Sequence, residues 1–298
     1  MEIPATHDED EPACLKKVFR FLFLFLPAVL FISVSCKQPR TEVKKKQPVI
    51  DSPVINYQQQ KQKVDSIAKV SVLKNKIYLT FDDGPNKGTL NVLNALKEDS
   101  VPSSFFIVGR HVSGSPEQTA TWEQLQADSA IQLCNHSYSH ALNQYKKYYR
   151  HPGSVVEDFK LNQQQLRFNN NLVRMPGRNA WRIDSIDHTD IKESKASIDS
   201  VHQAGFDIMG WDVEWMYDRK TLSLTTDTDL LLRQIQNLLV SGKTRTPDHL
   251  VLLVHDQAFR SEASVKKLHY LIQHLKNNPE YVLSLADSYP GIKKDLSK

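Results

Sequence analysis

The sequence predicts an α/β fold, a distorted barrel of the (β/α)7 type formed by a single domain. Seven short runs rich in apolar, β-branched or aromatic residues are typical of buried strands, at residues 77–81, 104–108, 131–134, 172–175, 206–211, 250–254 and 281–285. Stretches with helical spacing lie between them, at residues 89–97, 116–128, 155–168, 192–204, 229–239 and 263–276. Strands that alternate with helices indicate a parallel sheet with right-handed crossovers, closed or nearly closed into a barrel.

The composition agrees with one folded core. Of the 298 residues, 40% are hydrophobic and 24% are charged, which allows a domain of about 200–250 residues. The formal net charge of +4 comes partly from a basic stretch at residues 37–46, which is short and contains no aromatic residue. Such a stretch does not indicate a nucleic-acid surface. We therefore expect no nucleic-acid partner, and no feature implies a protein partner.

The N-terminal part predicts export and lipid anchoring. A basic segment at residues 16–20 precedes an apolar run at residues 21–34. The run has about 14 residues, fewer than the roughly 20 of a membrane span, which is the pattern of a signal peptide. It ends in Ser-Val-Ser-Cys at Cys36, which resembles the lipobox of bacterial lipoproteins, although Ser33 stands where leucine is usual. An uncleaved or differently cleaved apolar anchor is the alternative.

Three segments follow from these patterns. Residues 1–36 form the signal and lipoprotein targeting segment, and residues 37–70, charged and Gln-rich at their start, form a flexible tether. Residues 71–298 form the folded domain. With Cys36 as the lipid site, Cys134 is the one cysteine of the mature domain, so no disulfide framework is possible. We expect the protein in the cell envelope, anchored on the periplasmic or outer-surface side of a bacterial membrane.

Chemically active side chains follow the predicted strands. The first strand runs into Asp82 and Asp83, followed by a Gly-Pro turn, where barrel enzymes keep their reactive groups. An ordinary polar turn is the alternative, because Asp, Gly and Pro all favour turns. The third strand runs into His136 and His140, whose rings would point the same way if a helical turn begins there, as a metal site needs. The sixth strand delivers His255 at the same edge.

These motifs together resemble the polysaccharide deacetylases, also called the NodB-homology or carbohydrate esterase family 4 enzymes. The motifs Thr-Phe-Asp-Asp-Gly-Pro at Asp82 and His-Ser-x-x-His at His136 occur in the order found in that family. The resemblance covers roughly residues 76–285. It implies a distorted barrel that forms a single catalytic domain.

The resemblance also implies roles for the first two motifs. Asp82 would be the general base, while Asp83, His136 and His140 would bind one divalent metal ion. Zinc is the first choice of ion, and cobalt or another divalent ion is the alternative. One carboxylate and two imidazoles leave coordination positions open for water and substrate.

The third motif of the family, Arg-x-Pro-aromatic-Gly, corresponds to Arg-Met-Pro-Gly-Arg, which begins at Arg174. Arg174 would orient Asp82 and hold it ionised; a surface charge at a strand end is the alternative. The N–H of Gly177 would stabilise the oxyanion. The aromatic residue and the glycine after it are both missing here, so this loop departs from the pattern of the family.

The fifth motif makes His255 the general acid and Leu253 part of the pocket for the acetyl methyl group. The fourth motif is an Asp-Trp pair that partners this histidine and walls the pocket, and no single pair of residues in this sequence matches it clearly. The residues available for its roles are Trp211, Asp212, Glu214, Trp215 and Asp218. Asp212, Trp211 and Trp215 are our assignments, with Glu214 and Asp218 as alternatives for the acid and with plain core as the alternative for Trp211.

The resemblance implies a metal-dependent hydrolase that removes N- or O-linked acetyl groups from a carbohydrate polymer such as peptidoglycan or a chitin-like or xylan-like glycan. Because the third and fourth motifs are altered, a catalytically impaired glycan-binding protein on the same fold is the alternative.

Overall fold

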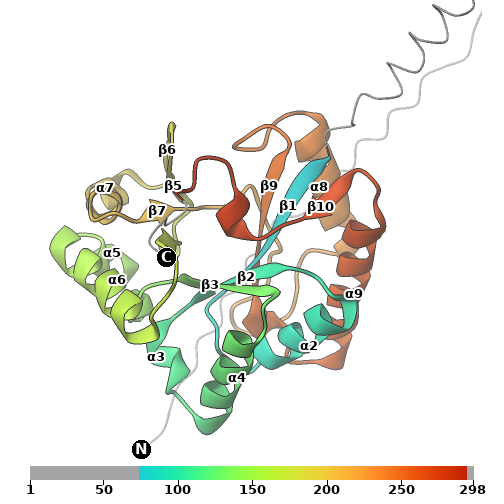
Figure 1. Ribbon diagram of the computed structural model, residues 1–298, viewed down its shortest axis with the longest axis horizontal. Coiled ribbons are helices and arrows are strands. Elements are labelled where there is room, and N and C mark those ends of the chain that lie inside the picture. The colour runs from blue at the N-terminus through green and yellow to red at the C-terminus, as the bar shows by residue number, and fades with distance from the viewer. Residues whose placement is uncertain (1–73, 294–298) are drawn as a thin grey trace, which may run out of the picture. The chain divides into compact units, whose positions relative to one another are not determined.

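A ten-stranded sheet runs through the protein, and its strands alternate with helices along most of the chain (Figure 1). The computed structural model describes residues 74–293. The predicted targeting segment at residues 1–36 and the predicted tether at residues 37–70 lie outside these residues. Within residues 74–293, no helix combines the length and the apolar character needed to cross a membrane.

The sheet is parallel except at one strand. The strands are β1 (Asn75–Asp82), β2 (Ser103–Ile107), β3 (Ile131–Asn135), β4 (Leu172–Val173), β5 (Ala180–Ile183), β6 (Ile186–Thr189), β7 (Asp207–Ile208), β8 (Val213–Glu214), β9 (His249–His255) and β10 (Tyr281–Leu283). Their order is β6-β5-β7-β4-β3-β2-β1-β9-β8, with β10 beside the start of β1. Strand β5 is antiparallel to both β6 and β7.

This topology confirms the α/β prediction and corrects one detail of it. Strands β6 and β8 stand at the two ends of the order, so the described sheet is a curled half-barrel rather than a closed or nearly closed barrel. All seven predicted strands are present. The hairpin of β5 and β6 was not predicted because its turn, with Asp184 at φ 50°, lacks the glycine that usually marks a two-residue turn.

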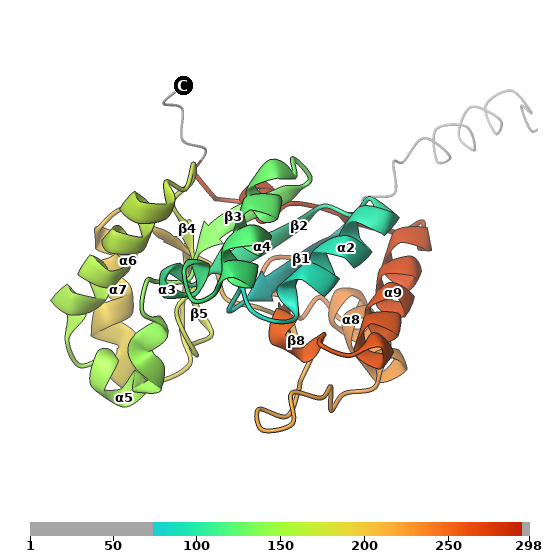
Figure 2. The same ribbon diagram turned by 90° about the horizontal axis from the view of Figure 1, so that it is seen from below.

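Helices form two groups beside the sheet. The helices are α2 (Thr89–Asp99), α3 (Gly109–Val112), α4 (Pro116–Ala127), α5 (Tyr145–Tyr148), α6 (Pro152–Leu166), α7 (Lys195–Gln203), α8 (Thr228–Val240) and α9 (Glu262–Asn277). Short 3₁₀ turns lie at His140–Asn143, Lys192–Ser194, Asp256–Ala258 and Ala286–Ser288. Figure 2 shows α5, α6 and α7 at one end of the sheet and α2, α8 and α9 at the other. All six predicted helices are present.

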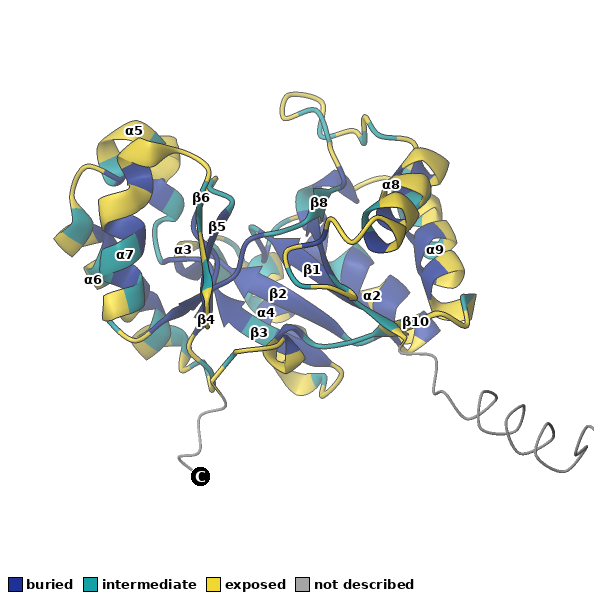
Figure 3. Ribbon diagram, turned by 90° about the horizontal axis from the view of Figure 1, so that it is seen from above, coloured by how far each residue is buried: buried dark blue, intermediate teal, exposed yellow. Residues whose placement is uncertain are grey.

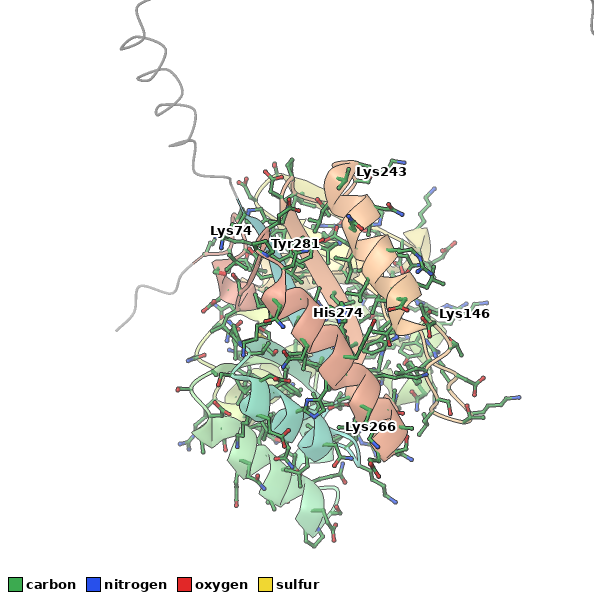
Figure 4. All side chains as sticks on the ribbon, turned by 90° about the vertical axis from the view of Figure 1, so that its right-hand side faces the viewer. Lys74, Lys146, Lys243, Lys266, His274 and Tyr281 are labelled. Atoms are coloured by element: carbon green, nitrogen blue, oxygen red, sulfur yellow. The ribbon has the colours of Figure 1, made fainter. Side chains whose placement is uncertain are left out.

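The core lies between the sheet and these helices, and the strands are its most buried part (Figure 3). Helix α9 buries Leu268, Leu271, Ile272 and Leu275, spaced as one face of a helix. Each such side chain contributes about 1.5–3 kcal/mol when fully buried. Figure 4 shows Lys266 and His274 on the outer side of the same helix.

The alternation of side chains along β1 and β9 prepares the site. On β1, Ile77, Leu79 and Phe81 join the core cluster that includes the helices α2, α8 and α9, whereas Tyr78 joins a separate cluster. Successive side chains of a strand point to opposite faces, so Asp82 shares the face of Tyr78. On β9, His255 shares the face of Val251 for the same reason. Strands β1 and β9 pair with Asp82 beside His255, which brings both side chains to the same face of the sheet.

Candidate active site

Asp82 and Arg174 form a buried ion pair at the carboxyl ends of β1 and β4. Arg174 is 0% exposed and Asp82 is 2% exposed. The Nη1 group of Arg174 donates to Asp82 Oδ1 at 2.7 Å and to Thr80 Oγ1 at 2.8 Å. Its Nε and Nη2 groups donate to the backbone carbonyls of Met209 and Gly210. Every nitrogen of the guanidinium is therefore held, and the carboxylate of Asp82 has a fixed position beside a permanent positive charge.

Asp83, His136 and His140 converge next to this ion pair. Asp83 Oδ1 lies 3.4 Å from His136 Nε2 and 3.0 Å from His140 Nε2. One ligand atom from each of the three residues lies within 4.8 Å of the others. His136 Nδ1 lies 2.8 Å from the carbonyl oxygen of Arg174, which turns its Nε2 toward Asp83.

The donor set fits a divalent cation. Asp83 Oδ1 is buried and makes no hydrogen bond within residues 74–293, although a buried carboxylate oxygen normally has a partner. Burial raises the pKa of Asp83, but the neighbouring imidazoles of His140 and His136 outweigh it and hold the pKa well below its usual value. An ionised oxygen facing two imidazole nitrogens is the arrangement that zinc and similar ions prefer.

The two histidines converge for a different reason from the one predicted. We expected a helical turn, but Ser137 has a φ of 64° and the four residues His140–Asn143 all have positive φ. The hydroxyl of Ser137 accepts a hydrogen bond from the N–H of His140 at 3.0 Å, and Asp158 on α6 accepts hydrogen bonds from Ser139. These side-chain bonds stabilise an irregular loop, in which the ring centroids of His136 and His140 lie 5.1 Å apart.

His255 reaches the same place from the end of β9. Its Nδ1 is buried, makes no hydrogen bond within residues 74–293, and lies 3.6 Å from Glu214 Oε1 on the neighbouring strand β8. The ring of Tyr217 packs on the imidazole, with the centroids 4.9 Å apart. Burial raises the pKa of Glu214, against the lowering effect of His255.

The structure separates Asp212 and Asp218 from His255. The carboxylate of Asp212, which we had assigned to this site, accepts hydrogen bonds from the N–H groups of Arg245 and Val251 at 2.6 and 2.8 Å. Asp218 likewise accepts from its own turn, at Lys220 and Thr221. Both acids stabilise the backbone, which leaves Glu214 as the acid that faces His255.

Comparison with known proteins agrees with this geometry. A sequence model described as polysaccharide deacetylase matches residues 69–177. This part of the chain is similar to the polysaccharide deacetylase family. The matched region includes Asp82, Asp83, His136, His140 and Arg174, and it ends before Glu214 and His255. The position of Glu214 and His255 in the site is therefore known from the tertiary structure.

Two curated relatives are similar in sequence to parts of this chain. The chain is 25% identical over 196 residues to a peptidoglycan-N-acetylglucosamine deacetylase of Bacillus cereus, which covers 63% of this chain and 62% of that protein. It is 34% identical over 74 residues to a chitin disaccharide deacetylase of Vibrio alginolyticus, covering 24% of this chain and 17% of that protein. The chain thus spans less than two thirds of these curated relatives.

The fold has a counterpart among solved structures. The catalytic domain of a peptidoglycan N-acetylglucosamine deacetylase from Eubacterium rectale matches with a TM-score of 0.53 and 21% identity, over 74% of this chain and 92% of that one. A likeness of this kind shows that the folded part of this chain shares the fold of that protein.

The residues of this candidate site surround one cavity. It has a volume of about 500 Å³. Its lining includes Gly177, Leu253 and Trp211 from the predicted pocket, together with Asn143, Tyr145, Tyr217, Arg219, Leu222 and Gln257. The added residues come from loops and short helical turns, where no strand-end pattern points to them. A second cavity of about 470 Å³ shares Asp83, His140, Asn143 and Gln257 with the first, so hollows extend on both sides of the predicted metal ligands.

The structure places Trp215 away from this cavity. Its ring is 0% exposed and packs edge-on against Phe259, with centroids 5.6 Å apart. Its Nε1 group donates to the carbonyl of Thr226. Trp211 lines the cavity, whereas Trp215 belongs to the hydrophobic core.

Proposed function

We propose that this protein hydrolyses N- or O-linked acetyl groups of a carbohydrate polymer by means of one divalent metal ion. The proposal rests on three groups of residues that lie around a single cavity. They are the pair of Asp82 and Arg174, the cluster of Asp83, His136 and His140, and His255. An acid and a base on either side of a cation site suit attack of water on an acyl carbon.

Asp83, His136 and His140 would hold the ion, zinc in the first instance. When bound, a divalent ion supplies Lewis-acid chemistry, which polarises an acyl carbonyl and acidifies water. Asp82 Oδ2 lies 3.7 Å from His136 Nε2, so the second carboxylate stays next to the cluster while Arg174 holds its other oxygen. Asp82 is then placed to accept a proton from the attacking water.

His255 would complete the reaction as the general acid. It protonates the leaving nitrogen or oxygen of the sugar, and Glu214 orients its ring through Nδ1. The N–H of Gly177 has no acceptor within residues 74–293, so it is available to donate to the developing oxyanion. Leu253, 1% exposed at the cavity wall, offers an apolar contact for the acetyl methyl group.

Peptidoglycan is our first choice of substrate, with chitin-like and xylan-like glycans as alternatives. Hollows on both sides of the cluster suit a chain that continues beyond the reacting sugar. Similarity to a peptidoglycan-N-acetylglucosamine deacetylase supports the same choice. We further propose that Cys36 carries a lipid that anchors the protein in the cell envelope, which would bring the domain close to such polymers.

The test is acetate release from peptidoglycan, acetylated chito-oligosaccharides and acetylxylan, with the full chain loaded with zinc. We expect release from at least one substrate, loss of release after chelation, and recovery when zinc is restored. A zinc-loaded protein that binds these glycans and releases no acetate from any of them would instead be the glycan-binding protein of the alternative prediction.

A further inference from the structure

The third motif of this chain lacks the aromatic residue that its family has, and the structure shows what lies there instead. Gly177 occupies that position, with a φ of +61°. A Cβ atom added to Gly177 would lie 3.0 Å from Cε1 and 3.2 Å from Cζ of Tyr145. The ring of Tyr145 therefore fills the space beside position 177. It reaches that space from α5, which lies well before the motif in the chain.

Three neighbours hold the ring of Tyr145 in place. The imidazole of His140 meets it nearly at right angles, at 86°, with centroids 5.8 Å apart. The guanidinium of Arg178, which stands where the family has glycine, lies 5.9 Å from the ring centroid. The hydroxyl of Tyr145 lies 3.5 Å from Asn143 Oδ1. A ring fixed by an edge contact, a cation and a polar contact of its hydroxyl has little freedom to turn.

The same ring lines the cavity with Asp83, His140 and Gly177. A phenol is neutral at physiological pH. A neutral aromatic surface beside an oxyanion donor is suited to packing against the apolar face of a sugar ring.

We propose that Tyr145 supplies, from α5, the aromatic wall that the third motif does not provide, and that it determines affinity for the glycan. This inference rests on the proposed function. The replacement has a structural basis, because glycine at 177 leaves room for the incoming ring and its left-handed φ disfavours any larger residue there. Tyr145 binds sugar in this proposal, and it takes no part in proton transfer.

The experiment compares Tyr145→Ala and Tyr145→Phe with the wild type. Each protein is loaded with zinc, its metal content is measured, and KM and kcat are determined for an acetylated oligosaccharide on which the wild type is active. We expect Tyr145→Ala to raise KM roughly 3- to 10-fold, the range of one aromatic contact, with less change in kcat and with metal retained. Tyr145→Phe should keep KM within about two-fold, because the ring remains. The control is Tyr270→Ala on α9, a tyrosine 44% exposed at the surface.

Several results would overturn the inference. An unchanged KM in Tyr145→Ala would show that the ring does not contact the glycan. Loss of zinc in that variant would show that the ring serves only to hold His140. A KM raised equally by Tyr145→Phe would assign the effect to the hydroxyl.

A binding measurement separates this inference from the proposed function. Titration calorimetry with N-acetylated chito-oligosaccharide needs no turnover. If the wild type is active and Tyr145→Ala changes neither KM nor affinity, the aromatic wall at Tyr145 is rejected and the proposed function stands. If the wild type is inactive and Tyr145→Ala lowers the affinity for the glycan, the hydrolytic function is rejected and the aromatic wall stands.

Discussion

Replacing Asp82 with Asn tests the proposed base while leaving the predicted metal ligands intact. The amide oxygen can still accept the hydrogen bond that Arg174 Nη1 donates at 2.7 Å to Asp82, so the side chain keeps its position. The change removes the proton acceptor for water, which costs typically about 10²–10⁴-fold in rate. That loss corresponds to about 2.7–5.5 kcal/mol in the activation free energy.

The same substitution also lowers the stability of the fold, and the burial of Arg174 indicates the size of this loss. Arg174 is 0% exposed, and in Asp82→Asn it loses its counter-charge inside the protein. Removing one partner of a buried ion pair costs about 3–5 kcal/mol. For a domain of this size each kcal/mol lowers Tm by about 2–4 °C, so we expect Tm to fall by about 6–20 °C. The rate must therefore be measured well below the lowered Tm.

Three measurements check this prediction together: acetate release, zinc content and Tm. We expect Asp82→Asn to retain zinc, lose activity and melt earlier. The control is Asp187→Asn, because the side chain of Asp187 is 66% exposed where it pairs with Arg182, and it should change none of the three appreciably. Full activity in Asp82→Asn would refute the role of Asp82 as base. Loss of zinc in that variant with zinc retained in Asp83→Asn would reverse the two assignments.

The remaining predictions concern the metal, the acid and the anchor. Asp83→Ala and His136→Ala should lose both zinc and activity, since a site with two ligands binds zinc weakly. The zinc affinity of the wild type should fall at acidic pH, because imidazole must be neutral to coordinate. An active enzyme that contains no zinc and resists chelators would contradict both expectations. Glu214→Gln should lower kcat about 10-fold or more with little change in Tm. Asp212→Asn should lower the free energy of unfolding by about 1–3 kcal/mol and retain kcat. A loss of kcat in Asp212→Asn with kcat retained in Glu214→Gln would return Asp212 to the role of partner for His255. Cys36→Ala should abolish fatty-acid labelling, and persistent labelling would rule out that cysteine as the lipid site.

The sequence by itself determined the α/β fold and the edge of the sheet at which the site lies. A side-chain period of two and runs of apolar residues identify buried strands locally, which is why all seven predicted strands are present. Parallel strands place their carboxyl ends at one edge. Residues at the carboxyl ends of β1, β3, β4 and β9 were therefore expected close together, and they lie close together in the structure. They include Asp82, His136, Arg174 and His255.

Only the tertiary structure decided the contacts that depend on loops and on the ends of the sheet. Three acids and two tryptophans between 211 and 218 are close in sequence. Only packing against β9 shows that Glu214 faces His255 while Asp212 binds backbone N–H groups. Tyr145 reaches Gly177 through a loop with consecutive positive φ values. Such loops are stabilised by side-chain hydrogen bonds between distant residues, as between Ser139 and Asp158, and no local period in the sequence encodes those bonds.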